Sequence, residues 1–80
     1  MLADDEPVTL LDLRGLKCPY PVLKTENRMK SMPAGGVLSV ETTDPLSAID
    51  LPHFCNQNGH QLVSLEKTAS GHVFVIRKHG

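Results

Sequence analysis

Cys18 is the residue of this chain whose sequence surroundings best suit covalent chemistry. It follows a β-prone segment and precedes Pro19 and Pro21, which cannot lie inside a helix but can begin one. The first N–H groups of a helix lack intrahelical partners and present a partial positive charge. A thiolate is stabilised there, so we expect the pKa of Cys18 to lie below the ~8.5 of a free cysteine. The pattern predicts a nucleophilic sulfur and disfavours a small buried hydrophobe.

The residues after Cys18 exclude one familiar use of cysteine. In Cys18-Pro19-Tyr20-Pro21 a proline stands where the second thiol of a Cys-x-x-Cys motif would be, so dithiol exchange has no local partner. Neither neighbour of Cys18 is a histidine or an acidic residue, so a general base would have to approach from elsewhere in the fold. The chemistry that remains needs one sulfur: the acceptance and donation of a group.

Cys55 has the opposite character. It follows Phe54 on an apolar stripe, which predicts a buried structural cysteine; a metal ligand or a redox partner of Cys18 is the weaker alternative. His53, Cys55 and His60 resemble metal-ligand spacing, but on one helix His53 and Cys55 would lie about 200° apart. Zinc needs three or four converging ligands. We therefore expect no metal and no bound cofactor, only a group held covalently by Cys18.

Basic residues cluster along the predicted first helix and form either a solvated face or a docking surface for an acidic patch on a partner. Tyr20, next to the thiol, would anchor such an interface, and Arg14 and Lys17 would add positive charge beside Cys18. Asp44, which precedes a proline, is most simply a helix N-cap, with a role in the site as the alternative. The residues expected to dock a partner or shape the site are Arg14, Lys17, Pro19, Tyr20, Pro21, Lys24, Arg28 and Asp44.

The remaining pattern predicts how these residues are positioned. An apolar stripe at helical spacing indicates a first helix from Pro19 or Pro21 to Met32, which the glycines after Pro33 end. Asp44-Pro45 and Asp50-Leu51-Pro52 each resemble a helix start, so we expect a helical turn at 45–49 and a separate helix at 51–58, stopped by Gly59. The inner face of that helix should carry Leu51, Phe54, Cys55 and Asn58. Strands are expected at 8–13, 37–42, 61–66 and 72–78.

The resulting order, βαβαββ, predicts an α+β fold. We expect a two-layer sandwich in which two helices pack on one face of a four-stranded mixed sheet. The first two strands should be parallel, and the last two should form a hairpin.

Composition limits the classes of protein that fit. The chain has 80 residues, enough for one domain, which we assign to 7–80 after a disordered tail at 1–6. A net charge of −1 and only 4% aromatic residues argue against nucleic-acid binding. The sequence contains no apolar run long enough for a bilayer and no signal-peptide pattern at its start. Two cysteines are too few for a disulfide scaffold. We expect a cytosolic protein, monomeric by itself, that binds neither nucleic acid nor membrane directly.

The segment Leu13–Val22, with its Cys-Pro-x-Pro motif, resembles the signature of the TusA/SirA-like sulfur carriers. The resemblance continues through Met32-Pro33-Ala34-Gly35-Gly36, Asp44-Pro45 and the stretch 50–63, and it covers 9–78. It implies the βαβαββ fold. It also implies that Cys18 takes a sulfane sulfur, as a persulfide, from a cysteine desulfurase or a rhodanese-type donor. The sulfur then passes to an acceptor protein, so the protein would be a carrier that needs partner enzymes.

The resemblance leaves three destinations for the sulfur open: tRNA thiolation, molybdenum-cofactor metabolism and sulfur oxidation. Thr43 stands where TusA itself often has Asp, and Tyr20 stands where some carriers have an acidic residue. One alternative function is a redox-sensitive regulatory or binding module without sulfur transfer. RNA binding is a second alternative, because similar small folds occur in ribosome-associated factors, but charge and composition oppose it.

Overall fold

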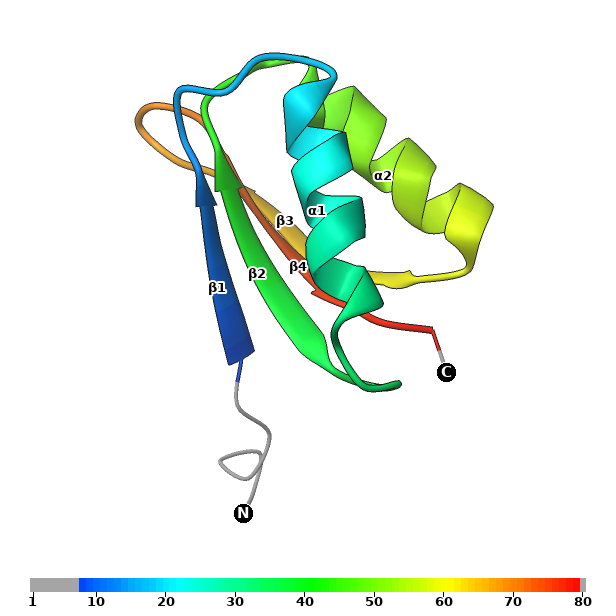
Figure 1. Cartoon of the computed structure of the whole chain (residues 1–80). Coiled ribbons are helices and arrows are strands. Elements are labelled where there is room, and N and C mark those ends of the chain that lie inside the picture. The colour runs from blue at the N-terminus through cyan, green and yellow to red at the C-terminus, as the bar shows by residue number, and fades with distance from the viewer. Residues whose placement is uncertain (1–7, 80) are drawn as a thin grey trace.

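In the computed structural model, which describes residues 8–79, four strands and two helices follow one another as βαβαββ (Figure 1). The strands are β1 (Val8–Leu13), β2 (Val37–Thr42), β3 (Gln61–Lys67) and β4 (His72–Arg77). The helices are α1 (Tyr20–Lys30) and α2 (Ser47–Asn58). This order confirms the predicted fold class. The tail predicted at 1–6 lies outside the described residues.

The strands form one mixed sheet in the order β1-β2-β4-β3. β1 and β2 are parallel with Val8 opposite Val37, whereas β4 is antiparallel to both β2 and β3. The predicted parallel pair and the final hairpin are thus both present. β4 inserts between β2 and β3, which completes the sheet.

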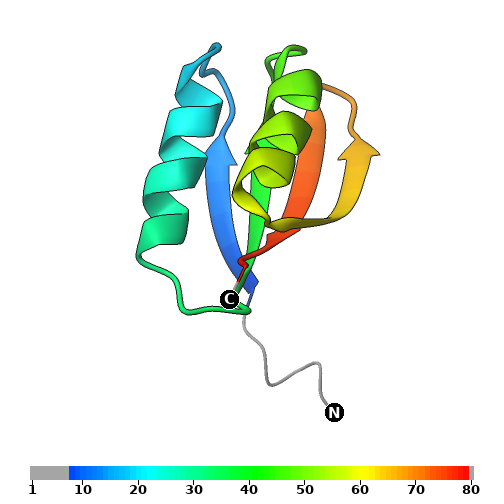
Figure 2. The same ribbon diagram turned by 90° about the vertical axis from the view of Figure 1, so that its right-hand side faces the viewer.

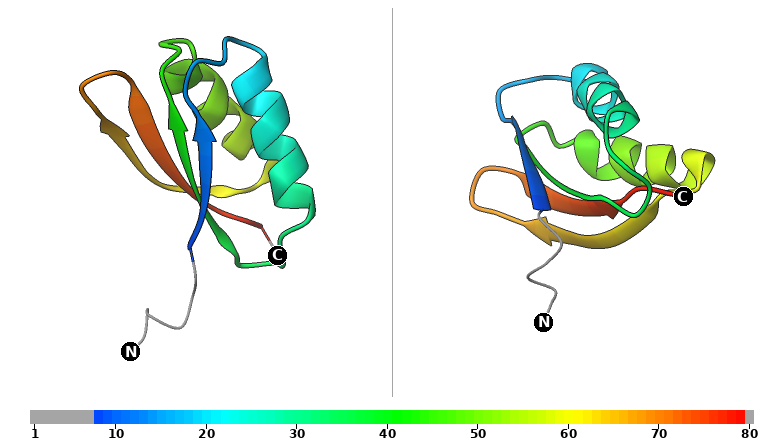
Figure 3. Two further views of the ribbon diagram at one scale, coloured as in Figure 1. Left: turned by 60° about the vertical axis from the view of Figure 1, so that its left-hand side comes forward. Right: turned by 60° about the horizontal axis from the view of Figure 1, so that its bottom comes forward.

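Both helices cover the same face of this sheet, as the rotated views show (Figures 2 and 3). Leu38, Val40, Phe74 and Ile76 of the two central strands are fully buried beneath them. On α1 the predicted stripe lies inward: Thr25, Met29 and, just beyond the helix, Met32 are buried, and Val22 packs against the core. Burial of these side chains supplies most of the favourable free energy of a fold this small.

α2 differs from the prediction because it is one continuous helix. The expected break between 45–49 and 51–58 is wrong: α2 runs from Ser47 through Pro52 to Asn58. Pro52 lacks the N–H that would bond to the carbonyl of Ala48, so the helix loses one hydrogen bond early in its length. In return, continuity buries Ser47, Leu51, Phe54 and Cys55 on one face.

Two further details of α2 concern its ends and its inner face. Gly59 ends the helix in a left-handed conformation at φ 74°, as expected for a glycine stop. Asn58, expected on the inner face, is exposed, and its side-chain amide donates to the carbonyl of Phe54. At the other end, a turn at Pro45 and Leu46 comes before the first helical residue, so Pro45 is not the first residue of the helix.

Candidate functional site

Cys18 lies in the loop between β1 and α1, at the edge of the sheet where β1 and β2 both end (Figure 1). Because the two strands are parallel neighbours, the loop that follows β1 and the loop that follows β2 meet at this edge. The N–H of Gly15 donates to the Thr43 hydroxyl at 2.9 Å. Parallel pairing therefore brings the cysteine loop against residues more than twenty positions away in the sequence.

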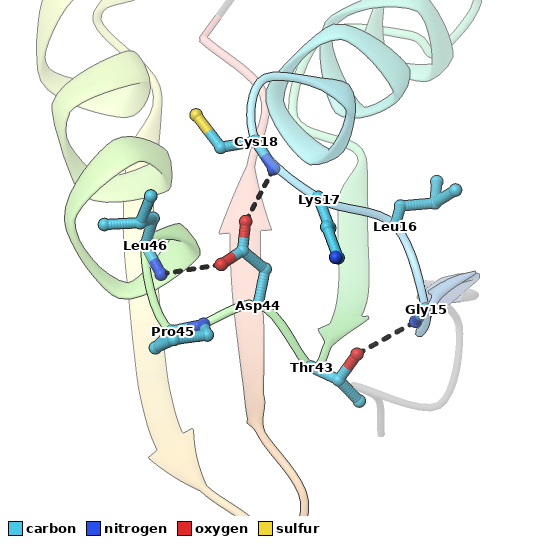
Figure 4. A pocket seen from close by; sticks show the side chains of 8 residues that line it. All are labelled: Gly15, Leu16, Lys17, Cys18, Thr43, Asp44, Pro45 and Leu46. Carbon is cyan, nitrogen blue, oxygen red and sulfur yellow. Dashed lines mark hydrogen bonds between the residues drawn. The ribbon is translucent and has the colours of Figure 1, made fainter.

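Asp44 holds this arrangement together (Figure 4). One carboxylate oxygen, Oδ2, accepts the N–H of Cys18, and the other, Oδ1, accepts the N–H of Leu46 at 3.1 Å. The main-chain carbonyl of Asp44 also accepts the N–H of Ser47, at 3.0 Å. Asp44 thus caps the turn before α2 and not the helix itself, and the same side chain also fixes the main chain at Cys18. Charge-assisted hydrogen bonds of this kind are among the stronger ones.

An open pocket of about 460 Å³ lies between the two loops. Its wall is mostly apolar, with one lysine and one carboxylate. The lining residues are Gly15, Leu16, Lys17, Cys18, Thr43, Asp44, Pro45 and Leu46 (Figure 4). A small anionic group on the cysteine would find both space and an amine here.

The thiol of Cys18 is exposed and turned toward α2 (Figure 4). Its S–H donates to Oδ2 of Asp50 in the first turn of α2, with a sulfur–oxygen distance of 3.0 Å. This hydrogen bond raises the pKa of the Cys18 thiol, and partial desolvation and the charges of Asp50 and Asp44 raise it further. A nearby carboxylate opposes formation of a second negative charge.

The expectation of a lowered pKa at Cys18 is therefore wrong, and the start of α1 shows why. Pro19 and Pro21 have no N–H, and the N–H of Tyr20 already donates to the carbonyl of Lys17 at 2.8 Å. Little of the positive end of α1 is left to stabilise a thiolate. The carboxylates of Asp50 in α2 and Asp44 in the loop before α2 outweigh the remaining effect of the helix end on the thiol.

Three of the residues predicted to surround Cys18 differ in accessibility. Tyr20 is 56% exposed in the first turn of α1, and Pro19 is exposed as well. Pro21 is fully buried, so it shapes the start of α1 from within the core and offers no surface to a partner.

The predicted basic residues do not form one patch beside the thiol. Lys17 lines the pocket, and Lys24 is exposed on α1. Arg28 lies in the last turn of α1, at the end of the helix remote from Cys18, and donates to the Ser31 hydroxyl at 2.6 Å. The guanidinium of Arg14 pairs with Asp12, with two contacts of 2.9 Å, and this holds the pKa of Asp12 at about 2. The positive charge of Arg14 is thus largely committed to Asp12.

Cys55 lies in the core with 2% of its surface exposed, as its sequence pattern predicts. Burial raises the pKa of the Cys55 thiol to about 11. His53, two residues before it on α2, is exposed. Neither side chain can join the other at a metal, because the helix turns them to different sides.

Sequence reasoning missed two features of the site. Asp50 was interpreted only as a helix cap; it lies 32 residues from Cys18, and no local pattern reports such a contact. The second feature is exposed apolar surface in the first turns of the helices and the turn before α2. It consists of Tyr20, already predicted at an interface from the sequence, and of three residues that were not: Leu23 (45% exposed), Leu46 (51%) and Ile49 (68%). Contiguous exposed apolar patches mark interaction surfaces, and these four side chains supply apolar surface at the end of the molecule that holds Cys18.

The chain is similar to known proteins along most of its length. Residues 9–78 match the family model described as Sulfurtransferase TusA. The chain is 39% identical over 77 residues to a sulfur carrier protein TusA of Pseudomonas putida (strain W619), covering 96% of each chain. A second TusA, from Pseudomonas paraeruginosa (strain DSM 24068 / PA7), is 41% identical over 69 residues, covering 86% of this chain and 87% of the relative.

The fold also resembles that of a SirA-like protein from Desulfitobacterium hafniense, whose crystal structure aligns with a TM-score of 0.72 at 24% identity. That match covers 89% of this chain and 95% of the other. Among the described residues, no helix is long and apolar enough to cross a membrane. From the match over 9–78 and the relatives close to 40% identical, we conclude that the chain belongs to the sulfurtransferase TusA family.

Proposed function

We propose that this protein is a sulfur carrier that takes a sulfane sulfur onto Cys18 as a persulfide and passes it to an acceptor protein. The observation that carries the proposal is the contrast between the two cysteines of the chain. Cys18 is exposed at a pocket with its main chain fixed by Asp44, whereas Cys55 is sealed in the core. Family membership supplies the sulfur chemistry that such a thiol would perform.

The transfer is an exchange at sulfur that needs no other oxidant or reductant. The Cys18 thiol gives up its proton, and the thiolate attacks the terminal sulfur of the donor's persulfide. A new S–S bond forms at Cys18 while the donor's S–S bond breaks, and the electron pair leaves with the donor's cysteine sulfur, which takes up a proton. Delivery to the acceptor repeats the step, with Cys18 now the leaving thiolate.

The partners are a donor, either a cysteine desulfurase or a rhodanese-type enzyme, and a downstream acceptor protein. The exposed apolar surface of Tyr20, Leu23, Leu46 and Ile49 supports docking around Cys18, and Lys24 adds a cationic group on α1. Tyrosines near the centre of an interface are among the residues that contribute most of its binding energy, which supports Tyr20 as an anchor. Both cysteines are free thiols, one exposed and one buried, which favours a reducing compartment, so we infer a cytosolic carrier.

A redox-sensing role fits the site less well. Oxidation by peroxide requires thiolate, and the contacts of Cys18 with Asp50 raise its pKa. A sulfur donor that docks on the apolar surface can rearrange these contacts, whereas peroxide in solution cannot. The geometry therefore favours a thiol that reacts inside a protein complex.

The test is loading followed by chemical release. The protein is incubated with a cysteine desulfurase, pyridoxal phosphate and cysteine, or with a rhodanese and thiosulfate, and then separated from the donor. Cyanide attacks sulfane sulfur and releases it as thiocyanate, which is measured per mole of carrier. The wild type and Cys55→Ser should release close to one equivalent from at least one donor, and Cys18→Ser close to none. Release that persists in Cys18→Ser would refute the assignment.

A further inference from the structure

Asp50 is hydrogen-bonded to the reacting sulfur, and neither its predicted capping role nor the transfer chemistry accounts for this contact. Its Oδ2 accepts the S–H of Cys18 at 3.0 Å across 32 residues of sequence. Asp50 also lines a second hollow of about 380 Å³ between α1 and α2, with Pro19 and Glu26 in the same wall. The thiol thus sits where the groove between the helices meets the pocket of the cysteine loop.

We propose that Asp50 is a positioning residue for sulfur transfer: its carboxylate holds the hydrogen of the unloaded Cys18 thiol, and loading breaks this contact. The inference rests on the proposed function and deepens it, because it assigns a control on the same site. The unloaded carrier keeps a protonated, directed thiol that reacts slowly with solution electrophiles.

The geometry explains how the contact distinguishes the two states of the carrier. An ionised carboxylate can only accept hydrogen bonds, so it suits a thiol and repels an anion. A persulfide is more acidic than the parent thiol, so a loaded Cys18 carries a negative charge at neutral pH. The loaded sulfur would then be pushed away from Asp50, toward the pocket where Lys17 supplies an amine.

Two carboxylates act on this thiol and further charged groups line the neighbouring pockets, so the test must separate their effects. Asp50 of α2 and Asp44 of the loop before α2 both oppose thiolate formation at Cys18. Lys17 lies in the cysteine loop itself. Glu26 of α1 and His53 of α2 share the wall of the hollow that contains Asp50. Asp50 is the only one of the described residues whose side chain is hydrogen-bonded to Sγ of Cys18.

The experiment is the pH dependence of alkylation at Cys18, measured on the unloaded full-length protein without any sulfur donor. Wild type, Asp50→Asn and Glu66→Gln are treated with iodoacetamide at constant 0.1 M salt between about pH 6 and about pH 10, a span that brackets an ordinary thiol. The Cys18 peptide is quantified by mass spectrometry, so that Cys55 does not contribute. Glu66→Gln is the matched control, because it removes one exposed carboxylate from β3.

The wild-type midpoint should lie above the ~8.5 of a free cysteine, and Asp50→Asn should lower it by about half a unit to one unit. Alkylation near pH 7 should then be about two- to threefold faster in Asp50→Asn, because a lower pKa also makes the thiolate a weaker nucleophile. Glu66→Gln should match the wild type. A merely structural role for Asp50 would leave the midpoint unmoved.

Three results would overturn the proposal: a wild-type midpoint at or below that of free cysteine, an unchanged midpoint in folded Asp50→Asn, or an equal shift in Glu66→Gln. Circular dichroism establishes that each variant is folded, and Asp50→Ser replaces Asp50→Asn if the latter is not. The outcome is independent of sulfur loading. A normal loss of loading in Cys18→Ser with an unmoved midpoint in Asp50→Asn would refute this inference alone.

Discussion

The carboxylate of Asp44 accepts the main-chain N–H of Cys18 across 26 residues of sequence. Its other oxygen accepts the N–H of Leu46, so one side chain joins the cysteine loop to the turn that starts α2. The direction in which the thiol points thus depends on a residue outside the Cys-Pro-x-Pro motif. The relationship follows from the parallel pairing of β1 and β2, which places both loops at one edge.

Replacing Asp44 by alanine should therefore loosen the site. Two N–H groups lose their acceptor, and we expect the free energy of unfolding to fall by about 1–2 kcal/mol. Urea denaturation of Asp44→Ala against wild type measures this loss, and the rate of sulfur loading should fall with it. Asp44→Asn keeps one side-chain acceptor oxygen, so its free energy of unfolding should lie between those of Asp44→Ala and the wild type. Equal stability of all three proteins would show that these hydrogen bonds contribute nothing to the fold.

Cys55→Ser should separate packing from chemistry. Cys55 is 2% exposed, so the variant places a hydroxyl in the apolar core and should be less stable by about 1–3 kcal/mol. Its loading with sulfur, measured below its unfolding temperature, should equal that of the wild type. Cys55→Ala is the matched control, since it removes the sulfur without adding a polar group. If folded Cys55→Ser failed to load, Cys55 would have to take part in the transfer.

Gly71 offers a test of how the turn between β3 and β4 supports the site. A Cβ at this position would overlap the main-chain carbonyl of Thr42 and the backbone of Thr43, the residue before Asp44. We expect Gly71→Ala to lower the free energy of unfolding by about 2 kcal/mol or more, because the backbone must shift. The melting temperature should fall accordingly. Ser70 is exposed in the same turn, so Ser70→Ala should have the melting temperature of the wild type. Identical melting curves for the two variants would contradict the close approach.

The fold could be read from the sequence because local patterns agreed with one another. Short apolar, β-prone segments between turn residues located all four strands, and the stripe through Thr25 and Met29 located α1. The continuity of α2 was harder to predict, because proline inside a helix usually breaks it when only the local sequence is considered. Burial of Leu51 and Phe54 on one continuous face outweighs the single hydrogen bond that Pro52 removes.

The site was only partly predictable for a related reason. The exposed Cys18 and the buried Cys55 each sit in a local context that predicts their environment. The protonation of Cys18 depends instead on Asp50, which only the packing of α2 against the cysteine loop brings within 3.0 Å. A contact between residues so far apart in the sequence leaves no local pattern from which it could be predicted.

The ion pair of Asp12 and Arg14 gives a prediction about pH. The hydrogen bonds of Arg14 lower the pKa of Asp12 from its ordinary 3.8 to about 2. A carboxylate with a depressed pKa in the folded state stabilises the fold above its unfolded pKa. That contribution is lost as the pH falls from near 4 through about 2.

Arg14→Gln should raise the pKa of Asp12 toward its ordinary value, as followed by NMR of the carboxyl carbon. Because both side chains are exposed and solvent screens the pair, the loss of stability at neutral pH should be small, and sulfur loading should stay that of the wild type. A pKa of Asp12 that stays depressed in the variant would mean that another group, and not Arg14, stabilises the carboxylate.

The central claim is that the sulfur is carried by Cys18, and intact-mass spectrometry of the loaded protein tests it most directly. After incubation with a desulfurase, pyridoxal phosphate and cysteine, the wild type should gain about 32 Da, one sulfur atom, and dithiothreitol should remove it by thiol exchange. Cys18→Ser should gain nothing under conditions in which Cys55→Ser gains the full increment. The same reducible gain in Cys18→Ser would contradict the account.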